Sequence, residues 1–513
     1  MKDLSPNALI LKELLKPEKM IETHISYVFI KDGYVYKIKK HVNFGFLDFT
    51  LAQQRRSFCY LEKELNSRFS DGIYVGLLKI VRKGKGFDIV PIENTLPTVE
   101  YIVKMKYIPD EKFLSYKVKN NLLSNKDFFK IGSDIALLFK KLKTDPNEAK
   151  EHGGYELIVK NCVENFEQTE KYVDKFISRS DYEYIKQRTL DFLEKNRELF
   201  IKRLKDGYVI DGHGDLRAEH VYFDDDKLGL IDCIEFNKRF RYNDVVSDFV
   251  FLCMELDYSG EVNGSDEMLK GFLSIYNDEG SKQLINFYKC YRAYVRFKVG
   301  CFMLDGKDES WEFYGEKLKE VRRMADLALS YALNIYKGKQ IVFYGMIASG
   351  KSKNGIYFSE KYAGRYLNSD IIRKEMAGID PLSKVYDDYN KGLYSEENSL
   401  KLYKNLGRLA KESIGLGRMV IIDASFSKPV YLESFRETNN EPIFKIRCYA
   451  PDEIVYERLE KRKNKGSVSD GRLEIYEQQK KDFIDMGADL EIETTGDLDD
   501  NMKYIMENIK SIS

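Results

Sequence analysis

The stretch that decides the fold reads Gln340-Ile341-Val342-Phe343-Tyr344-Gly345-Met346-Ile347-Ala348-Ser349-Gly350-Lys351-Ser352. From Gly345 onward it matches the pattern G-x-x-x-x-G-K-[ST], and the apolar run in front predicts the buried first strand of a parallel sheet. Glycines allow the backbone to curl so that successive N–H groups point at phosphate oxygens. Lys351 would then reach the β- and γ-phosphates, and the Ser352 hydroxyl would bind Mg²⁺. We therefore expect a nucleotide to contact Gly345, Ser349, Gly350, Lys351 and Ser352.

The residues after this loop alternate strand-like and helix-like patterns, which is typical of a parallel sheet with crossover helices. In front of the loop, a long amphipathic pattern at 309–336 ends at Lys337-Gly338-Lys339. We therefore predict an α/β P-loop domain with a parallel sheet over 338–513, and the chain before it must form a separate fold. Further strands are expected at 366–368, 419–422, 444–449 and 490–493.

Two acidic residues stand at predicted strand ends of this domain, where open parallel sheets bind their ligands. Asp423 follows Val420-Ile421-Ile422 and is placed to contact Mg²⁺ through water, although an Asp here would also cap the next turn. Asp370 is placed to take the proton from an acceptor hydroxyl, and Arg373 to clamp an acceptor phosphate. In the competing interpretation, Ser369 or Asp370 caps a helix and Arg373 is solvated.

The D-x-x-R spacing of Asp370 and Arg373 resembles the polynucleotide-kinase and zeta-toxin group of small kinases. In that group a helix forms a lid whose arginines close over the phosphates, and the resemblance gives this role to Arg458 and Arg462. These two residues share one face of the predicted helix 453–463, and the stretch 464–470 would be the tip of the lid. Ordinary surface ion pairs along the helix are the competing explanation.

Strand patterns and then helical patterns fill the N-terminal part. Two apolar strands flank Lys31-Asp32-Gly33, a strong hairpin signal, and the 3.6-residue period takes over from Lys126. We predict a two-lobed α+β domain with a sheet-rich lobe at 1–110 and a helical lobe at 111–337. The expected elements include strands at 25–30, 34–39 and 101–107, a helix near 51–67, and a small sheet at 208–211, 221–223 and 229–231.

The helical lobe contains His213-Gly214-Asp215, and Asp232 follows the next apolar strand. One acidic residue on a tight loop and a second at a strand end are what a phosphotransferase needs. The first carboxylate accepts or orients the proton of the acceptor hydroxyl, and the second holds the metal that bridges the ATP phosphates. Taken alone, a Gly-Asp turn is common, and the motif is equally consistent with a surface turn.

The continuation of this motif resembles the aminoglycoside phosphotransferase family, which has a protein-kinase-like fold. The family loop H-G-D-x-x-x-x-N matches at 213–215, so the resemblance makes Asp215 the catalytic Asp and Asp232 the metal-binding Asp. Asp248 lies in the acidic segment that follows and would brace the catalytic loop. His220 replaces the family Asn, the second metal ligand. A neutral imidazole suits Mn²⁺ better than Mg²⁺, so His220 binds the metal, or activity is altered, or this lobe has lost catalysis.

In the first lobe, Val35-Tyr36-Lys37 looks like the third strand of the same family, which implies that Lys37 pairs with ATP phosphates and with a helix Glu. Glu64 is the predicted partner and Glu62 the second choice; without the resemblance, these would be ordinary solvated charges. The segment around Met105 looks like the hinge that bonds adenine through its backbone. No Gly-rich loop covers the phosphates, so residues 23–26 would take its place. The subgroup that shares these motifs is often fused to a C-terminal phosphate-loop domain, as here.

The composition of the chain limits which partners and which cellular compartment are expected. Lys+Arg and Asp+Glu both number 83, so no overall electric field favours nucleic acid or a membrane surface. The 7 cysteines form no C-x-x-C pair, which indicates reduced thiols and a cytoplasmic protein. No apolar run reaches about 18 residues, so no membrane span is expected. No feature of the sequence points to an obligate protein partner.

These observations lead to the hypothesis of a two-headed phosphotransferase. Each half binds ATP with Mg²⁺, or with Mn²⁺ in the N-terminal site, and phosphorylates a hydroxyl group of a small molecule, a nucleotide or an RNA end. Two other hypotheses stay open. In one, the N-terminal half is a nucleotide-binding pseudokinase that regulates the other half. In the other, the C-terminal half is an ATPase switch.

Overall fold

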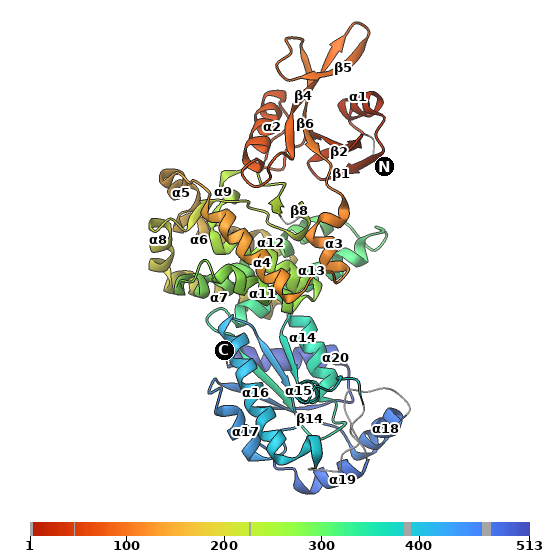
Figure 1. Ribbon diagram of the computed structural model, residues 1–513, viewed down its shortest axis with the longest axis vertical. Coiled ribbons are helices and arrows are strands. Elements are labelled where there is room, and N and C mark those ends of the chain that lie inside the picture. Colours follow the sequence, from red (N-terminus) through yellow and green to blue (C-terminus); the bar gives the residue numbers. More distant parts are fainter. Residues whose placement is uncertain (1–3, 46, 225–226, 384–390, 464–472, 513) are drawn as a thin grey trace. The chain divides into compact units, whose positions relative to one another are not determined.

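The computed structural model describes residues 4–45, 47–224, 227–383, 391–463 and 473–512. By its internal contacts the chain forms two compact units, whose elements are labelled in Figure 1. Unit 1 comprises Met1–Ile158, Arg197–Glu255 and Gly271–Tyr276, and unit 2 comprises Val159–Asn196, Leu256–Lys270 and Asn277–Ser513.

Unit 1 contains a six-stranded antiparallel sheet of order β1-β2-β3-β6-β4-β5. The predicted hairpin is confirmed: β2 (Ser26–Lys31) pairs with β3 (Tyr34–Lys39) across Asp32 and Gly33, which both have positive φ as a tight turn requires. Helix α2 (Ala52–Asn66) packs on this sheet. The other elements are α1 (Pro6–Leu15), β1 (Lys19–Glu22), β4 (Tyr74–Lys83), β5 (Gly86–Pro91) and β6 (Thr98–Lys106).

The rest of unit 1 is mainly helical, and two small antiparallel sheets interrupt the helices where the sequence predicts a single small sheet of three strands. β7 (Val209–Asp211) pairs with β10 (Tyr242–Asp244), a strand that the sequence did not predict, and β8 (Val221–Asp224) pairs with β9 (Lys227–Leu230). The helices are α3 (Leu114–Lys119), α4 (Asn125–Lys140), α5 (Pro146–Gly153), the first part of α6 (Tyr155–Thr169), α8 (Arg197–Lys205), α9 (Lys238–Arg241) and most of α10 (Val245–Ser259), with 3-10 turns η1 (Asp110–Lys112) and η3 (Ala218–His220).

Unit 2 contains a five-stranded parallel sheet of order β12-β13-β11-β14-β15. β11 (Gln340–Tyr344) lies in the middle and is buried along its whole length, as predicted for the first strand. The predicted fold class is thus confirmed: an antiparallel sheet with helices is followed by an α/β P-loop domain. The other strands are β12 (Arg365–Asn368), β13 (Val420–Asp423), β14 (Ile443–Tyr449) and β15 (Leu490–Glu493).

Helices of unit 2 surround this sheet or precede it in the chain. The crossover and flanking helices are α14 (Lys351–Tyr362), α15 (Ser369–Met376), α16 (Glu396–Gly415), α17 (Pro429–Arg436), α18 (Asp452–Lys463), α19 (Leu473–Asp482) and α20 (Leu498–Ser511), with the 3-10 turn η4 (Gly392–Tyr394). The preceding elements are η2 (Glu170–Tyr172), α7 (Arg179–Lys195), α11 (Val262–Leu273), α12 (Glu279–Leu304) and α13 (Tyr314–Leu333).

A buried cluster of charges fastens these preceding helices to the base of the parallel sheet. Arg418, directly before β13, has its Nη1 2.9 Å from Asp257 Oδ1 and donates through Nε to Asp266 Oδ1 over 2.8 Å. Lys289 also contacts Asp257, at 2.9 Å. Gly338 fits here because a Cβ would lie 2.3 Å from the Arg418 carbonyl oxygen. The division of the chain into 1–110, 111–337 and 338–513 stays a prediction.

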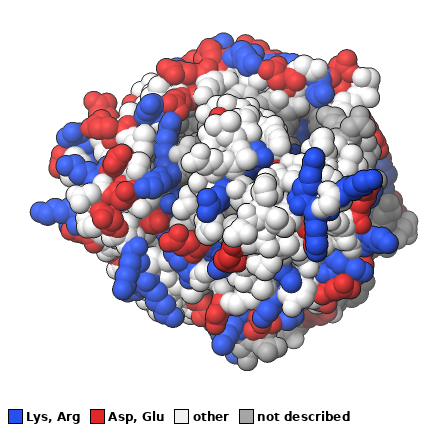
Figure 2. Space-filling view, turned by 90° about the horizontal axis from the view of Figure 1, so that it is seen from above, with Lys and Arg blue, Asp and Glu red and all other residues white. Residues whose placement is uncertain are grey.

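On one face of the molecule the charged side chains are mixed in sign (Figure 2). Figure 2 shows basic and acidic residues interspersed over the face that it displays, in keeping with the equal totals of 83 and 83. None of the helices in the described part of the chain combines the length and the apolar character that crossing a bilayer requires.

Candidate active sites

The lysine of the third strand is paired, but with the second-choice glutamate. Lys37 Nζ lies 2.9 Å from Glu62 Oε1 and 2.6 Å from Asp232 Oδ1. The prediction of Glu64 as the partner was wrong. The buried side of α2 repeats at Arg55, Cys59 and Glu62, at helical spacing, which turns Glu64 to solvent.

A second lysine shares the same glutamate. Lys39 lies on the same face of β3 as Lys37, and its Nζ is 2.7 Å from Glu62 Oε2. Glu235 also contacts Lys39, and sequence reasoning missed this partner. Burial raises the pKa of Glu62, but the ammonium groups of Lys37 and Lys39 lower it below its usual range. Burial also lowers the pKa of Lys37, whereas Asp232 and Glu62 raise it well above its usual range. The carboxylates therefore keep Lys37 charged.

The loop of Asp215 is braced through its backbone. Asp248 accepts the N–H groups of His213 and Gly214, over 2.5 and 2.9 Å. Gly214 has φ 82°, and a Cβ there would lie 2.8 Å from the Phe240 carbonyl oxygen. Both the positive φ and the lack of room for a Cβ require glycine at this position. The path of the backbone that leads into Asp215 is therefore fixed. Asp248 thus has the bracing position that the resemblance implies.

His220 stands between the two acidic residues of this site. Its Nδ1 lies 2.8 Å from the Asp215 carbonyl oxygen, which can only accept, so Nδ1 carries the proton. In the neutral ring, Nε2 then keeps its lone pair, and it lies 3.6 Å from Asp232 Oδ2. Asp232 has φ 63°, a strained value for a non-glycine residue that is common at functional sites. The structure thus brings Asp215, His220 and Asp232 together.

The electrostatics of Asp232 favour its charged form. Desolvation by the surrounding groups raises the pKa of this carboxyl, although 48% of its side chain is exposed, but the Lys37 ammonium and the His220 imidazole lower it well below its usual range. His220 Nε2 and Asp232 fit a metal ion as two of its ligands, and ATP phosphates and water would complete the shell. In the described ranges no group of three or more His, Cys, Asp or Glu is placed to hold a metal by itself.

The segment predicted as the adenine hinge lies at the end of β6. Met105 is buried there and pairs with Val35 and Tyr74 of the neighbouring strands. The N–H groups of Lys106 and Tyr107 donate to Ile73 and Gly33. An adenine ring would therefore have to bond to other backbone groups of this segment, and its placement at Met105 stays a prediction.

The phosphate loop has the geometry that its glycines predict. Gly345 has φ 140° and Gly350 has φ 91°, and a Cβ at either would lie 2.4 Å from the Cys448 carbonyl oxygen or from Thr494 Oγ1. Lys351 begins α14 directly after the loop, so the loop ends at a helix N-terminus, a position that favours anions. Ser349 Oγ is buried without a partner in the part of the chain that the structure describes.

Asp423 is fully buried at the end of β13, with one oxygen engaged. Its Oδ2 accepts the Tyr366 hydroxyl over 2.5 Å and the Asn368 amide over 2.7 Å. Its Oδ1 is buried and has no partner among the described residues. These two neighbours, which sequence reasoning missed, fix the carboxylate. A buried oxygen left open is what a water-mediated Mg²⁺ contact requires.

The first turn of α15 is capped by a residue that the sequence did not single out. Asn368 Oδ1 accepts the N–H groups of Asp370 and Ile371, each over 3.0 Å. The competing interpretation of Ser369 or Asp370 as the cap is therefore wrong. Arg373 is buried rather than solvated, and its Nη1 donates to Leu393 O and Ser399 Oγ over 3.2 and 3.1 Å. The acceptor-binding roles of Asp370 and Arg373 stay predictions.

Of the two predicted lid arginines, only Arg458 has a side chain that the structure describes. Arg458 Nη1 donates to the Ala348 carbonyl over 3.1 Å, and Nη2 donates to the Thr494 carbonyl over 2.7 Å. It thus supports the phosphate loop from outside, in addition to any role above the phosphates. The side chain of Arg462 and the stretch 464–470 lie outside the described residues.

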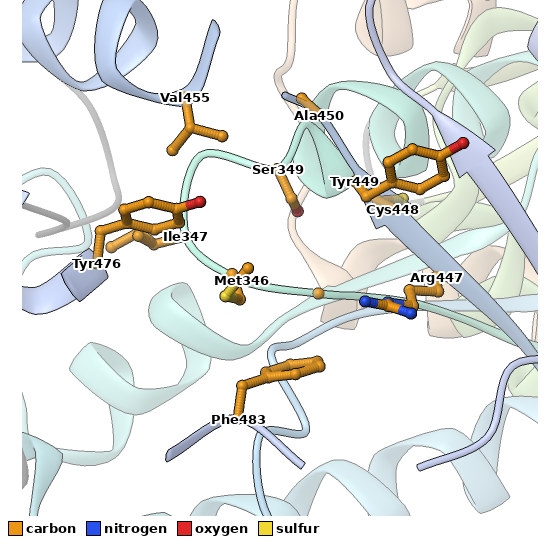
Figure 3. A pocket seen from close by; sticks show the side chains of 11 residues that line it. Met346, Ile347, Ser349, Arg447, Cys448, Tyr449, Ala450, Val455, Tyr476 and Phe483 are labelled. Atoms are coloured by element: carbon orange, nitrogen blue, oxygen red, sulfur yellow. The ribbon is translucent and has the colours of Figure 1, made fainter. Parts of the chain in front are cut away.

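A small hollow with a cavity volume of about 30 Å³ opens beside the phosphate loop (Figure 3). Met346 and Ile347 of the loop face it, together with side chains from β14, α18 and α19. Most of the lining residues are apolar or aromatic. The lining residues beyond the loop include Tyr449, Val455, Tyr476 and Phe483.

Comparison with known proteins adds to this geometry. Residues 341–484 match the family described as "AAA domain". The C-terminal part is a P-loop domain. An uncharacterized protein of Mycobacterium tuberculosis (strain ATCC 25618 / H37Rv) is 26% identical over 458 residues, which is 88% of each chain. A UPF0200 protein of Methanosarcina mazei is 30% identical over 131 residues, covering 24% of this chain and 66% of that protein.

Solved structures are similar to both parts. A sugar kinase from Janibacter sp. HTCC2649 is 16% identical with a TM-score of 0.26, covering 33% of this chain and 93% of its own. The APS kinase of Mycobacterium tuberculosis is 15% identical with a TM-score of 0.27, over 34% of this chain and 98% of its own. A putative aminoglycoside phosphotransferase from Ralstonia eutropha JMP134 is 10% identical with a TM-score of 0.38, over 61% of this chain and 91% of its own.

The shared glutamate generates a stability prediction. Glu62→Ala removes the buried carboxylate from the buried Lys39 and the partly buried Lys37, so we expect a loss of about 3 kcal/mol in the free energy of unfolding, measured by chemical denaturation. Glu64→Ala, on the exposed side of the same helix, should change it by less than about 0.5 kcal/mol. Because the pKa of Glu62 is lowered in the folded state, its contribution is present above its unfolded pKa and is lost as the pH falls through the folded value. Equal effects of the two substitutions would contradict the pairing.

Proposed function

We propose that this chain is an ATP-dependent phosphotransferase with two nucleotide sites, each transferring the γ-phosphate to a hydroxyl group. The observation that carries the proposal is a pair of buried oxygens without partners among the described residues: Ser349 Oγ in the phosphate loop and Asp423 Oδ1 at the end of the neighbouring strand β13. Leaving such atoms without a partner costs free energy unless a ligand or water satisfies them. A nucleotide with Mg²⁺ supplies partners of the right kind to the loop and to Asp423.

In the C-terminal half, the loop N–H groups and Lys351 would hold the phosphates, and Ser352 with Asp423 would hold Mg²⁺. The ion, when bound, bridges the phosphates and offsets their charge. Asp370 would take the proton of the acceptor hydroxyl. Arg373 would need to exchange its contacts with Leu393 and Ser399 for an acceptor phosphate.

In the N-terminal half, Glu62 and Asp232 keep Lys37 charged and in place to bind phosphates. Asp232 and His220 would hold the metal. Asp215 would accept the proton of the acceptor hydroxyl, and Asp248 fixes the loop that carries it.

The acceptor is a hydroxyl compound: a small molecule for either half, or a nucleotide or RNA end for the C-terminal half. The equal numbers of basic and acidic residues disfavour a long nucleic acid, whose binding relies on many cationic contacts.

A second candidate function rests on His220. Its imidazole stands where the resembling family has an amide, and it lies against both acidic residues of the site. In this alternative the N-terminal half binds nucleotide without transferring phosphate and regulates the C-terminal kinase or ATPase.

Phosphate transfer from γ-labelled ATP separates these functions. Cell extract split into RNA and metabolite fractions is incubated with wild type, Asp215→Ala, Asp370→Ala and Lys351→Ala. We expect two labelled products, one reduced about 10² to 10⁴-fold by Asp215→Ala and the other reduced similarly by Asp370→Ala and Lys351→Ala. Lys353→Ala, exposed two residues along the same helix, is the matched control.

If Asp215→Ala leaves every product intact while Lys351→Ala abolishes transfer, the N-terminal half is a pseudokinase. If wild type only hydrolyses ATP with every fraction offered, transfer itself is disproved and the switch hypothesis gains.

The metal preference of the N-terminal half depends on His220. An imidazole nitrogen favours Mn²⁺ relative to Mg²⁺, whereas an amide oxygen suits Mg²⁺. We expect the ratio of Mn²⁺-supported to Mg²⁺-supported nucleotide binding to fall several-fold in His220→Asn, measured in a Lys351→Ala background that silences the other site. An unchanged ratio would show that His220 does not bind the metal.

A further inference from the structure

The amide of Gln479, on α19, contacts the phosphate loop. Its Oε1 accepts the backbone N–H of Ile347 over 2.9 Å, and the residue is only 8% exposed. Because an N–H can only donate, the amide must turn its oxygen toward the loop, which directs Nε2 and its two hydrogens elsewhere. A helix remote in sequence thus supplies a fixed acceptor to one N–H group of the loop.

Helix α19 is itself held firmly at this place. The Tyr476 hydroxyl donates to Asp452 Oδ1 over 2.7 Å, and Lys480 contacts the other oxygen of Asp452. Asp452 begins α18, directly after β14 and its following turn. Gln479 therefore reaches the loop from an anchored element.

The same face of α19 borders the hollow beside the loop. Tyr476 of α19 and Phe483, directly after the helix, line that hollow (Figure 3). Gln479 follows Tyr476 by three residues, so the two share one face of α19. Ile347, the residue whose N–H Gln479 accepts, lines it as well. The contact therefore joins the wall of the hollow to the loop that would hold the phosphates.

We propose that Gln479 is a positioning residue of the C-terminal nucleotide site, an inference that rests on the proposed function. It holds Ile347 so that the loop keeps its curvature before the nucleotide arrives. A loop ordered in advance binds more tightly, because binding then costs less conformational entropy. Glutamine is suited to this task because it offers an acceptor without a negative charge, which would repel phosphate.

Two substitutions in the full-length chain test this role. In Gln479→Glu the carboxylate can still accept the Ile347 N–H, but it adds a negative charge beside the loop. We expect a non-hydrolysable ATP analogue to bind at least about tenfold more weakly at pH 8. The deficit relative to wild type should shrink as the pH falls to about 4, near the ordinary pKa of a glutamate, because the protonated carboxyl is neutral. Gln479→Leu, which removes the acceptor, should weaken binding several-fold at every pH.

The matched controls are Gln478→Glu and Gln478→Leu, at the exposed neighbouring position, and both should bind like wild type. Binding at the P-loop site is defined as the part that Lys351→Ala removes. A pH-dependent recovery in Gln479→Glu identifies a charge effect that a folding defect would not produce.

Equal or tighter binding by either Gln479 variant would overturn the proposal, and so would a deficit of Gln479→Glu that does not change with pH. If wild type shows binding that depends on Lys351 while the Gln479 variants match it, only the role of Gln479 fails. If wild type shows no such binding, the proposed function fails first and the role of Gln479 fails with it.

Discussion

The tight turn of the chain between β11 and α14 is the constraint on which the C-terminal site depends. Gly345 and Gly350 take backbone angles that other residues rarely adopt, and neighbouring backbone and side-chain atoms fill the space where a Cβ would lie. The turn ends at the N-terminus of α14. Residues from three other elements support it from outside: Arg458, Gln479 and Thr494 each bond to a backbone atom of the loop.

In the proposed N-terminal site, side-chain carboxylates rather than backbone turns hold the groups that would bind phosphate. A phosphate site needs a cation that stays charged and stays in place, and burial works against both because it strips the cation of water. Here one buried carboxylate, Glu62, pairs with both Lys37 and Lys39. Asp232 is the second partner of Lys37, and Glu235 is the second partner of Lys39. Removing Glu62 takes a carboxylate from both lysines at once. The arrangement therefore ties β3, α2 and the segment after β9 to one geometry.

Much of the fold could be predicted from local patterns. The hairpin at Asp32-Gly33, the buried strand β11 and the parallel sheet follow from turn chemistry and hydrophobic period, which act over a few residues. To choose between Glu62 and Glu64, one must know which side of α2 is buried. The positions of Arg55 and Cys59, on the same side as Glu62, would have shown this. Contacts between segments that lie far apart in the sequence could not be predicted from local patterns. Nothing local distinguishes Glu235, Tyr366 or Gln479 from solvated polar residues, and their partners lie far away in sequence.

The central claim is that the chain has two separate pockets for a nucleoside triphosphate, one around Lys37 and one around Lys351. Calorimetric titration of the intact protein with a non-hydrolysable ATP analogue and Mg²⁺ or Mn²⁺ counts them most directly. The account predicts two equivalents bound per chain, of which Lys37→Ala removes one and Lys351→Ala the other. A single equivalent, or none, in the wild-type protein would contradict it.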